Sequence, residues 1–174
     1  MRYLIARDPK FNPLQFSAQQ FAPRYREISE MFDATNPDLS AFLARGGKLI
    51  VKGNGADYRR SILQEITYYK AVVAKMGQAR VDGFIRFYVT PGVDHPGNGV
   101  TISGAAVPAK VDLLGALDGW ADGGKAPAEL MQVSQEPKAP FKTLSARPMC
   151  LYPAFPRYSG QGDPNEASSF ACAK

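Results

Sequence analysis

The chain has 174 residues, of which 45% are hydrophobic and 21% charged, with a formal net charge of +5 and an isoelectric point near 9.2. This length suits one domain with a hydrophobic core and is too short to expect two. The basic residues are scattered, often beside acids, and no aromatic stacking motif accompanies them, so we expect no nucleic-acid partner. No run of 18 apolar residues occurs, which predicts no membrane-spanning segment. The first residues meet Asp8 and Pro9 too early for a signal peptide, so no export signal is expected there.

Residues 1–35 form an N-terminal lead-in whose structure the sequence leaves ambiguous. They are rich in aromatic side chains, and Ile28, Met31 and Phe32 indicate one amphipathic helix over about 18–32. Clearer signals follow, because Asn36-Pro37-Asp38 is typical of a helix start. Arg45-Gly46-Gly47 is typical of a helix end with a left-handed glycine. We expect a short helix between these two motifs.

Two strands, each followed by a glycine-containing loop, are predicted next. Residues 48–51 include a continuous apolar run typical of a parallel strand buried on both faces. The loop after this strand ends in Asp57. Residues 84–89 form the second predicted strand, and the loop after it contains His95. The two loops therefore follow equivalent ends of neighbouring strands.

A helix is predicted after each of these loops. A capping-box motif, Ser61-Ile62-Leu63-Gln64, starts the first helix and Gly77 ends it. Its apolar face is formed by Ile62, Ile66, Tyr69, Val73 and Met76. The second helix is expected over about 108–122, with one face formed by Val111, Leu114, Leu117 and Trp120 or Ala121. The alternation of strands and helices in residues 36–124 predicts an α/β fold, in which helices pack on a parallel sheet.

Residues 125–174 form a proline-rich tail, which we expect to be irregular structure draped over the single domain 1–174. Both cysteines, Cys150 and Cys172, lie in it, and their spacing fits neither a zinc site nor a redox CxxC motif. A covalent link between them would stabilise the tail by about 3 kcal/mol and would persist only in an oxidising compartment. The alternative is two separate buried thiols.

Asp57 and His95 are the residues that could carry chemistry. Loops that follow parallel strands lie side by side at one edge of the sheet, so an aspartate and the chain's only histidine can meet there. The carboxylate would accept the Nδ1 proton, and Nε2 would be free to take a proton from a hydroxyl. Each residue also has a plainer interpretation, as a turn former or a solvated histidine, and Asp82 and Asp94 are competing acids.

A catalytic triad of the α/β-hydrolase type runs serine, acid, histidine along the chain, and Asp57 and His95 follow this order. Several motifs around them point to one family of such enzymes. They include Ala56-Asp57, Pro91-Gly92-Val93-Asp94-His95, Leu117-Asp118-Gly119-Trp120, Arg147-Pro148-Met149-Cys150-Leu151-Tyr152-Pro153 and Tyr158-Ser159-Gly160-Gln161-Gly162-Asp163. On these motifs the sequence resembles the tannase and feruloyl esterase family over nearly the whole chain.

The resemblance implies the C-terminal part of an α/β-hydrolase fold and a serine esterase that acts on aromatic-acid esters such as gallates and ferulates. It makes Asp57 the triad acid, His95 the general base and Cys150–Cys172 a structural disulfide. It implies neither a cofactor nor a metal ion, and it implies a secreted or periplasmic protein.

Three features depart from the family's pattern. Members carry their nucleophile in a Gly-Cys-Ser-x-Gly-Gly elbow upstream of the acid, and this chain contains no Gly-x-Ser-x-Gly sequence. Pro96 stands where a cysteine normally follows the histidine. Arg59 and Arg60 stand where apolar residues are usual.

Two hypotheses follow. In the first, the chain is the C-terminal segment of an aromatic-ester esterase that is active only when a serine-bearing segment completes it. The few strands would leave a sheet edge unpaired, so we expect a companion chain or self-association. In the second, the chain is a catalytically inactive remnant or a binding subunit of the same fold. An unrelated basic interaction module is a third alternative.

Overall fold

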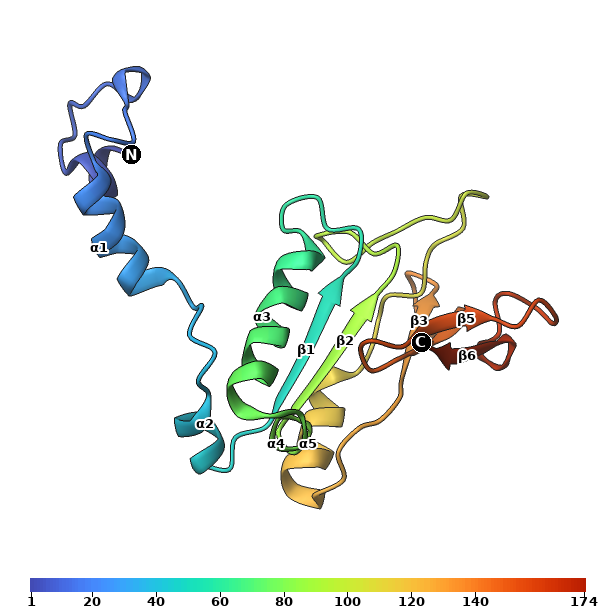
Figure 1. The fold of residues 1–174 in the computed structure, drawn as a ribbon. Helices are drawn as coiled ribbons and strands as arrows, with labels where there is room; N and C mark the ends of the chain where they lie inside the picture. The colour runs from blue at the N-terminus through green and yellow to red at the C-terminus, as the bar shows by residue number, and fades with distance from the viewer. The chain divides into compact units, whose positions relative to one another are not determined.

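The computed structural model describes all residues 1–174 (Figure 1). The chain forms two compact units, Met1–Asn36 and Pro37–Lys174. The first unit contains a π-helical turn η1 (Arg2–Ala6), a 3-10 turn η2 (Pro13–Gln15) and the helix α1 (Ala22–Phe32). The helix expected over about 18–32 is therefore present but begins later. Aromatic rings hold this unit together, with centroids 5.4–6.0 Å apart among Phe11, Phe16, Phe21 and Tyr25.

The second unit is built around two parallel strands, β1 (Leu49–Asn54) and β2 (Ile85–Thr90), which Figure 1 shows side by side. The helices α3 (Ile62–Met76) and α4 (Gln78–Asp82) connect them, and α5 (Leu113–Gly123) follows β2. The predicted parallel arrangement is confirmed, with residue pairs running from Leu49↔Ile85 to Asn54↔Thr90. The carboxyl ends of both strands consequently lie at the same edge.

Helices cover both faces of this small sheet. Successive side chains of a strand point to opposite faces, so two neighbouring residues of β2 show what covers each face. Ile85 belongs to the core cluster on one face, together with Val72 and Met76 of α3. The next residue, Arg86, points to the other face, where its guanidinium lies 5.2 Å from the ring of Trp120 in α5. The unit is thus layered as helix, sheet and helix.

The two strands differ in burial. Four of the six residues of β2 are buried, whereas Leu49, Ile50 and Val51 of β1 are only half-buried. The prediction that this first strand is buried on both faces is therefore wrong. The reason is that β1 pairs with β2 alone, so its other edge carries no neighbouring strand.

Side-chain caps decide where the helices begin. Ser61 caps α3 as predicted, by accepting a hydrogen bond from the Leu63 N–H. The short helix α2 (Ser40–Ala44) begins later than the Asn36 motif predicts, since Asp38 accepts a hydrogen bond from the Ser40 N–H at 3.0 Å. The left-handed glycine after α2 is confirmed, with Gly46 at φ +74°. None of the helices is both long and apolar enough to cross a membrane.

The helix α5 also begins later than its pattern predicts, at Leu113 instead of near residue 108. Lys110 pairs with Val133 in an isolated antiparallel bridge, so the residues before α5 are extended. Asp112 then caps the helix by accepting from the Gly115 N–H at 2.8 Å. Trp120 is buried as expected, but Leu114 is 79% exposed, so the predicted apolar face is correct only in part.

The tail is more regular than the sequence predicts. It contains four strands in two antiparallel pairs: β3 (Leu130–Gln135) with β4 (Thr143–Met149), and β5 (Phe155–Tyr158) with β6 (Phe170–Ala173). The expectation of irregular structure is wrong. The sequence did not reveal these strands because several of their inward-facing residues are polar. Gln132, Ser134 and Ser145 are buried, which hides the alternation of apolar residues that normally identifies a strand.

Candidate active site

Asp57 and His95 meet at the carboxyl edge of the β1–β2 sheet. The Asp57 Oδ2 atom lies 2.9 Å from His95 Nδ1, which is hydrogen-bonding distance. The carboxylate is nearly covered, with 7% of its side-chain surface exposed, whereas the imidazole is 45% exposed. The acid is therefore held inside the loop and the histidine faces outward from it.

The backbone of its own loop fixes the second carboxylate oxygen of Asp57. Oδ1 accepts hydrogen bonds from the N–H groups of Arg59 at 2.8 Å and Arg60 at 3.1 Å. The hydrogen bond to His95, helped by these two N–H groups, lowers the pKa of Asp57 to about 2, although burial acts in the opposite direction. Asp57 is thus ionised at neutral pH and can accept the Nδ1 proton.

Direct bonds between the two loops set the position of the pair. The N–H of Gly55 donates to the Thr90 carbonyl at 2.8 Å, and the N–H of Ala56 donates to the Val93 carbonyl at 2.9 Å. The acid loop therefore continues the parallel ladder beyond the strands. These backbone hydrogen bonds bring Asp57 beside the histidine loop.

Asn54 is a positioning residue that the sequence analysis missed. Its Nδ2 donates to the Asp94 carbonyl at 2.8 Å, and its Oδ1 accepts from Lys52 Nζ at 2.6 Å. Lys52 is half-buried, and burial lowers the pKa of its ammonium group. The amide thus links the end of β1 to the residue before His95. An asparagine between two glycines is typical of a turn, so the sequence offered no signal for this role.

The histidine loop also depends on a close backbone approach at Gly99. A Cβ atom at this position would overlap the carbonyl oxygen of Gly92. A hydrogen bond also holds Gly99 in place, since the Val107 N–H donates to the Gly99 carbonyl at 2.8 Å. The loop folds back on itself there, which limits the positions that His95 can occupy.

The arrangement can carry out general base catalysis. Asp57 fixes the tautomer with the proton on Nδ1, so Nε2 has a free lone pair to accept a proton from a hydroxyl. No hydrogen bond joins Nε2 to another group among residues 1–174, and the ring is accessible to an approaching group. The exposed ring of Tyr58 lies beside it, with ring centroids 6.3 Å apart.

The competing acids do not reach the histidine. Asp94 uses its carboxylate within its own loop, where Oδ1 accepts from the Asn98 N–H at 2.7 Å. Asp82 is the last residue of α4 and accepts a hydrogen bond from Gln78 Nε2 at 2.7 Å within that helix. Asp57 is the acid that the structure places against His95.

Cys150 and Cys172 form a disulfide, with Cα atoms 5.6 Å apart. This bond joins the residue after β4 to a residue of β6, so it ties the two antiparallel pairs of the tail together. The alternative of two separate thiols is therefore excluded for this structure.

A cavity lies away from the acid–histidine pair. It has a volume of about 890 Å³, and its lining includes Tyr69, Phe87 and Tyr152 together with Glu129 and Cys172. Neither Asp57 nor His95 contributes to it. We place the candidate active site at the pair, since hydrogen-bonded catalytic geometry is found there and not in the cavity.

Parallel strands covered by helices, with an acid–imidazole pair at their carboxyl ends, are features of the α/β-hydrolase class. The chain belongs to the tannase and feruloyl esterase family, whose family model matches residues 1–173.

Individual relatives agree with this assignment. An uncharacterized esterase of Agrobacterium fabrum is 36% identical over 176 aligned residues, which cover 99% of this chain and 30% of that protein. A probable feruloyl esterase of Arthroderma benhamiae is 35% identical over 179 aligned residues, covering 100% of this chain and 32% of that protein. The chain thus spans about a third of the length of these curated relatives.

The fold is shared with a solved structure. The crystal structure of feruloyl esterase B from Aspergillus oryzae matches with a TM-score of 0.79 at 24% identity, over 99% of this chain and 36% of that one. The backbone of this chain is therefore similar to that of a feruloyl esterase, in agreement with the similarity in sequence.

Proposed function

We propose that Asp57 and His95 are the acid and the general base of a serine carboxylic-ester hydrolase. The observation that carries the proposal is the 2.9 Å contact between Asp57 Oδ2 and His95 Nδ1, with Nε2 directed away from the acid and accessible. The ionised state of Asp57 supports it, since only a carboxylate stabilises the imidazolium that forms when Nε2 takes a proton.

The attacking serine is supplied by a segment other than these 174 residues. Two observations support this part of the proposal: the sequence contains no Gly-x-Ser-x-Gly elbow, and the relatives are about three times as long. In the completed site, His95 Nε2 takes the serine proton while the serine oxygen attacks the ester carbonyl. The same nitrogen then returns the proton to the leaving alcohol, and water releases the acid from the acyl-enzyme.

The substrates are esters of aromatic acids. The support is the relatives, of which one is named as a probable feruloyl esterase. We further propose an oxidising compartment for the folded chain, because a disulfide such as Cys150–Cys172 persists there.

Complementation tests the function. The chain would be assayed on p-nitrophenyl and feruloyl esters alone, and then mixed with the part of the Agrobacterium fabrum esterase that lies outside the matched region. We expect no turnover from the chain alone, turnover from the mixture, and its loss in His95→Ala. The matched control is Asn98→Ala, an exposed change in the same loop that should leave turnover intact.

Each other outcome has a defined meaning. Turnover by the chain alone that His95→Ala abolishes would contradict the need for an external serine. Binding of ferulate to the chain, with no hydrolysis in any mixture, would favour the alternative of an inactive binding subunit. The departures at Pro96, Arg59 and Arg60 are the features that make this alternative worth testing.

A further inference from the structure

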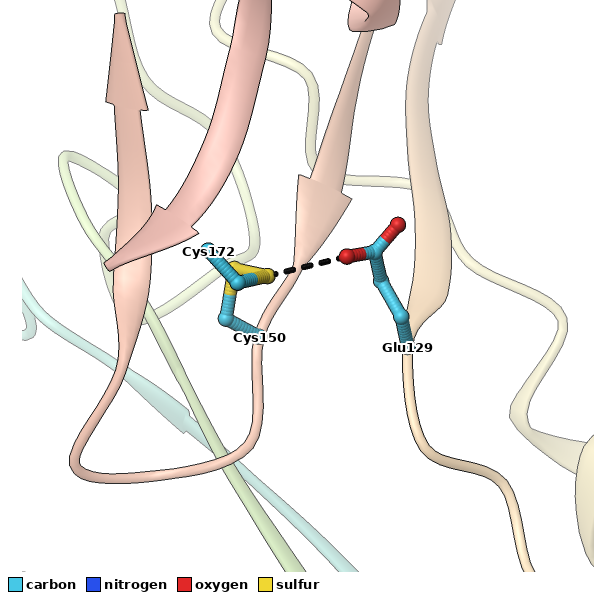
Figure 2. A group of neighbouring side chains, drawn as sticks. All are labelled: Glu129, Cys150 and Cys172. Atoms are coloured by element: carbon cyan, nitrogen blue, oxygen red, sulfur yellow. Dashed lines mark hydrogen bonds between the residues drawn. A yellow bond between two sulfur atoms is a disulfide. The ribbon is translucent and has the colours of Figure 1, made fainter. Parts of the chain in front are cut away.

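Three potential metal ligands from different segments meet in the tail, where Figure 2 shows Glu129 facing the Cys150–Cys172 disulfide. A Glu129 carboxylate oxygen lies 3.0 Å from Cys172 Sγ, and the ligand atoms of the three residues all lie within 4.8 Å of one another. A disulfide sulfur carries no hydrogen, so this contact is not a hydrogen bond. The carboxylate therefore lies next to a disulfide bond that a reductant can cleave.

The backbone, and not the disulfide alone, brings these residues together. Leu130 of β3 pairs with Met149 of β4, so Glu129 and Cys150 are the next residues along two paired strands. Cys172 lies opposite Pro156 in the β5–β6 pair. A second link does not depend on sulfur, since the Ala146 N–H of β4 donates at 2.8 Å to the carbonyl of Asn165, in the segment that connects β5 to β6.

We propose that reduction of the Cys150–Cys172 disulfide creates a zinc site formed by two thiolates and the Glu129 carboxylate. Reduction adds two electrons and two protons to the disulfide and gives two thiols. A trialkylphosphine supplies the electrons and becomes the phosphine oxide with the oxygen of water. Zinc then replaces the two thiol protons, which pass to solvent, so the metal bridge takes the place of the covalent one.

The geometry fits the preferences of zinc. Zinc binds thiolate sulfur at about 2.3 Å in a tetrahedral arrangement, which separates two sulfur ligands by about 3.8 Å. Once the bond is broken, side-chain rotation can open the sulfurs to this separation, because the Cα atoms are already 5.6 Å apart. A carboxylate oxygen is an accepted third ligand.

Solvent can supply the fourth ligand. Cys172 and Glu129 are exposed and both line the cavity of about 890 Å³, while Cys150 is fully buried. A reductant can therefore reach Cys172 Sγ, and water can reach a metal held there. Cysteine spacing alone did not predict this site because the third ligand comes from strand register, which spacing does not show.

The test uses the full chain in its reduced and oxidised forms. After anaerobic reduction and removal of the phosphine, the chain would be titrated with Co²⁺ and with Zn²⁺ against a chromophoric chelator. We expect one equivalent to bind the reduced chain, with a thiolate-to-cobalt charge-transfer band and tetrahedral ligand-field bands, and no such binding to the oxidised chain. Circular dichroism would report whether the reduced chain keeps its fold.

A conservative substitution separates this site from binding by any pair of thiols. We expect Glu129→Gln to weaken zinc binding by at least the roughly 10–100-fold that loss of an outer-shell partner costs. Glu166→Gln, which removes another exposed carboxylate of the tail, should change nothing. Equal affinity in both variants, equal binding to the oxidised chain, or a reduced chain that unfolds and binds no metal would each overturn the proposal.

Discussion

The low pKa of Asp57 makes the stability of the second unit depend on pH in an acidic window. The pKa of this carboxyl is about 2 in the folded chain, against an ordinary value of about 3.9 in the unfolded chain. A lowered pKa contributes stability that is fully present above the unfolded value and is lost as pH falls toward the folded value. We therefore expect the contribution of Asp57 to decline between about pH 5 and pH 2.

Two measurements check this expectation. Carbon-detected NMR of the Asp57 carboxyl should show a titration midpoint near pH 2. The difference in unfolding free energy between the native chain and Asp57→Asn should be constant near neutrality and should shrink through the acidic window. Asp118→Asn, an exposed acid of α5, is the control and should show no such change. An ordinary midpoint near pH 4 would refute the hydrogen-bonded geometry.

Asn54 gives a second prediction at a single residue. Asn54→Ala removes the partner of the half-buried Lys52 and the bond to the Asp94 carbonyl. We expect a loss of about 1–3 kcal/mol of unfolding free energy, because polar groups are left without partners. Urea unfolding would measure it, and hydrogen exchange at Gly55 and Ala56 should accelerate. Asn98→Ala is the matched control, and an equal effect of both changes would remove the positioning role from Asn54.

At the level of elements, two glycines with opposite surroundings predict opposite effects of the same substitution. Gly99→Ala would place a methyl group against the Gly92 carbonyl, so we expect a loss of about 1–3 kcal/mol or more. Gly119 lies within α5 with open space around its Cα, so Gly119→Ala should stabilise the chain by about 1 kcal/mol. Thermal unfolding of both variants checks the two opposite changes in stability. No loss in Gly99→Ala would contradict the described loop, and a loss in Gly119→Ala would contradict the open space described at that position of α5.

The disulfide is the covalent element of the tail. Its cysteines are 22 residues apart, and closing a loop of this length stabilises the folded state by about 3 kcal/mol. We expect the double variant Cys150→Ala, Cys172→Ala to lose about this amount in urea unfolding. The native chain under reducing conditions and without metal should lose a similar amount. An unchanged midpoint in both experiments would show that the strands hold the tail by themselves.

Local sequence signals predicted the elements around the acid and histidine and failed in the tail. The parallel order of β1 and β2 and the cap at Ser61 follow from short patterns. The strands β3 and β4 were missed because their inward positions carry Gln132, Ser134 and Ser145. Such buried polar residues depend on partners distant in the sequence, and spacing alone cannot reveal them. The role of Asn54 was missed for the same reason, since its partner Asp94 lies 40 residues away.

For the molecule as a whole, the open edge of β1 is the feature with the largest consequence. The strand pairs with β2 alone, and its apolar residues are only half-buried. An unpaired strand presents free N–H and C=O groups that another strand can bind. We propose that this edge receives either a companion chain or a second copy, in agreement with the need for an external serine.

The N–H groups of alternate residues of β1 point to opposite edges of the strand, so a single proline can block the open edge without disturbing the bonds to β2. The N–H of Leu49 donates to the carbonyl of Phe84, just before β2, and the N–H of Gly55, just after β1, donates to the carbonyl of Thr90. Odd-numbered residues of β1 therefore direct their N–H groups toward β2, and Ile50 directs its N–H to the open edge. The native chain should associate as its concentration rises, with a mass in sedimentation velocity above the 18.9 kDa of one copy. Ile50→Pro should stay folded and monomeric, because proline removes only an edge N–H. Val51→Pro, which breaks the ladder to β2, should unfold the second unit. A native chain that sediments as one copy at every concentration, with a sharp cooperative urea transition, would show that the edge of β1 needs no partner.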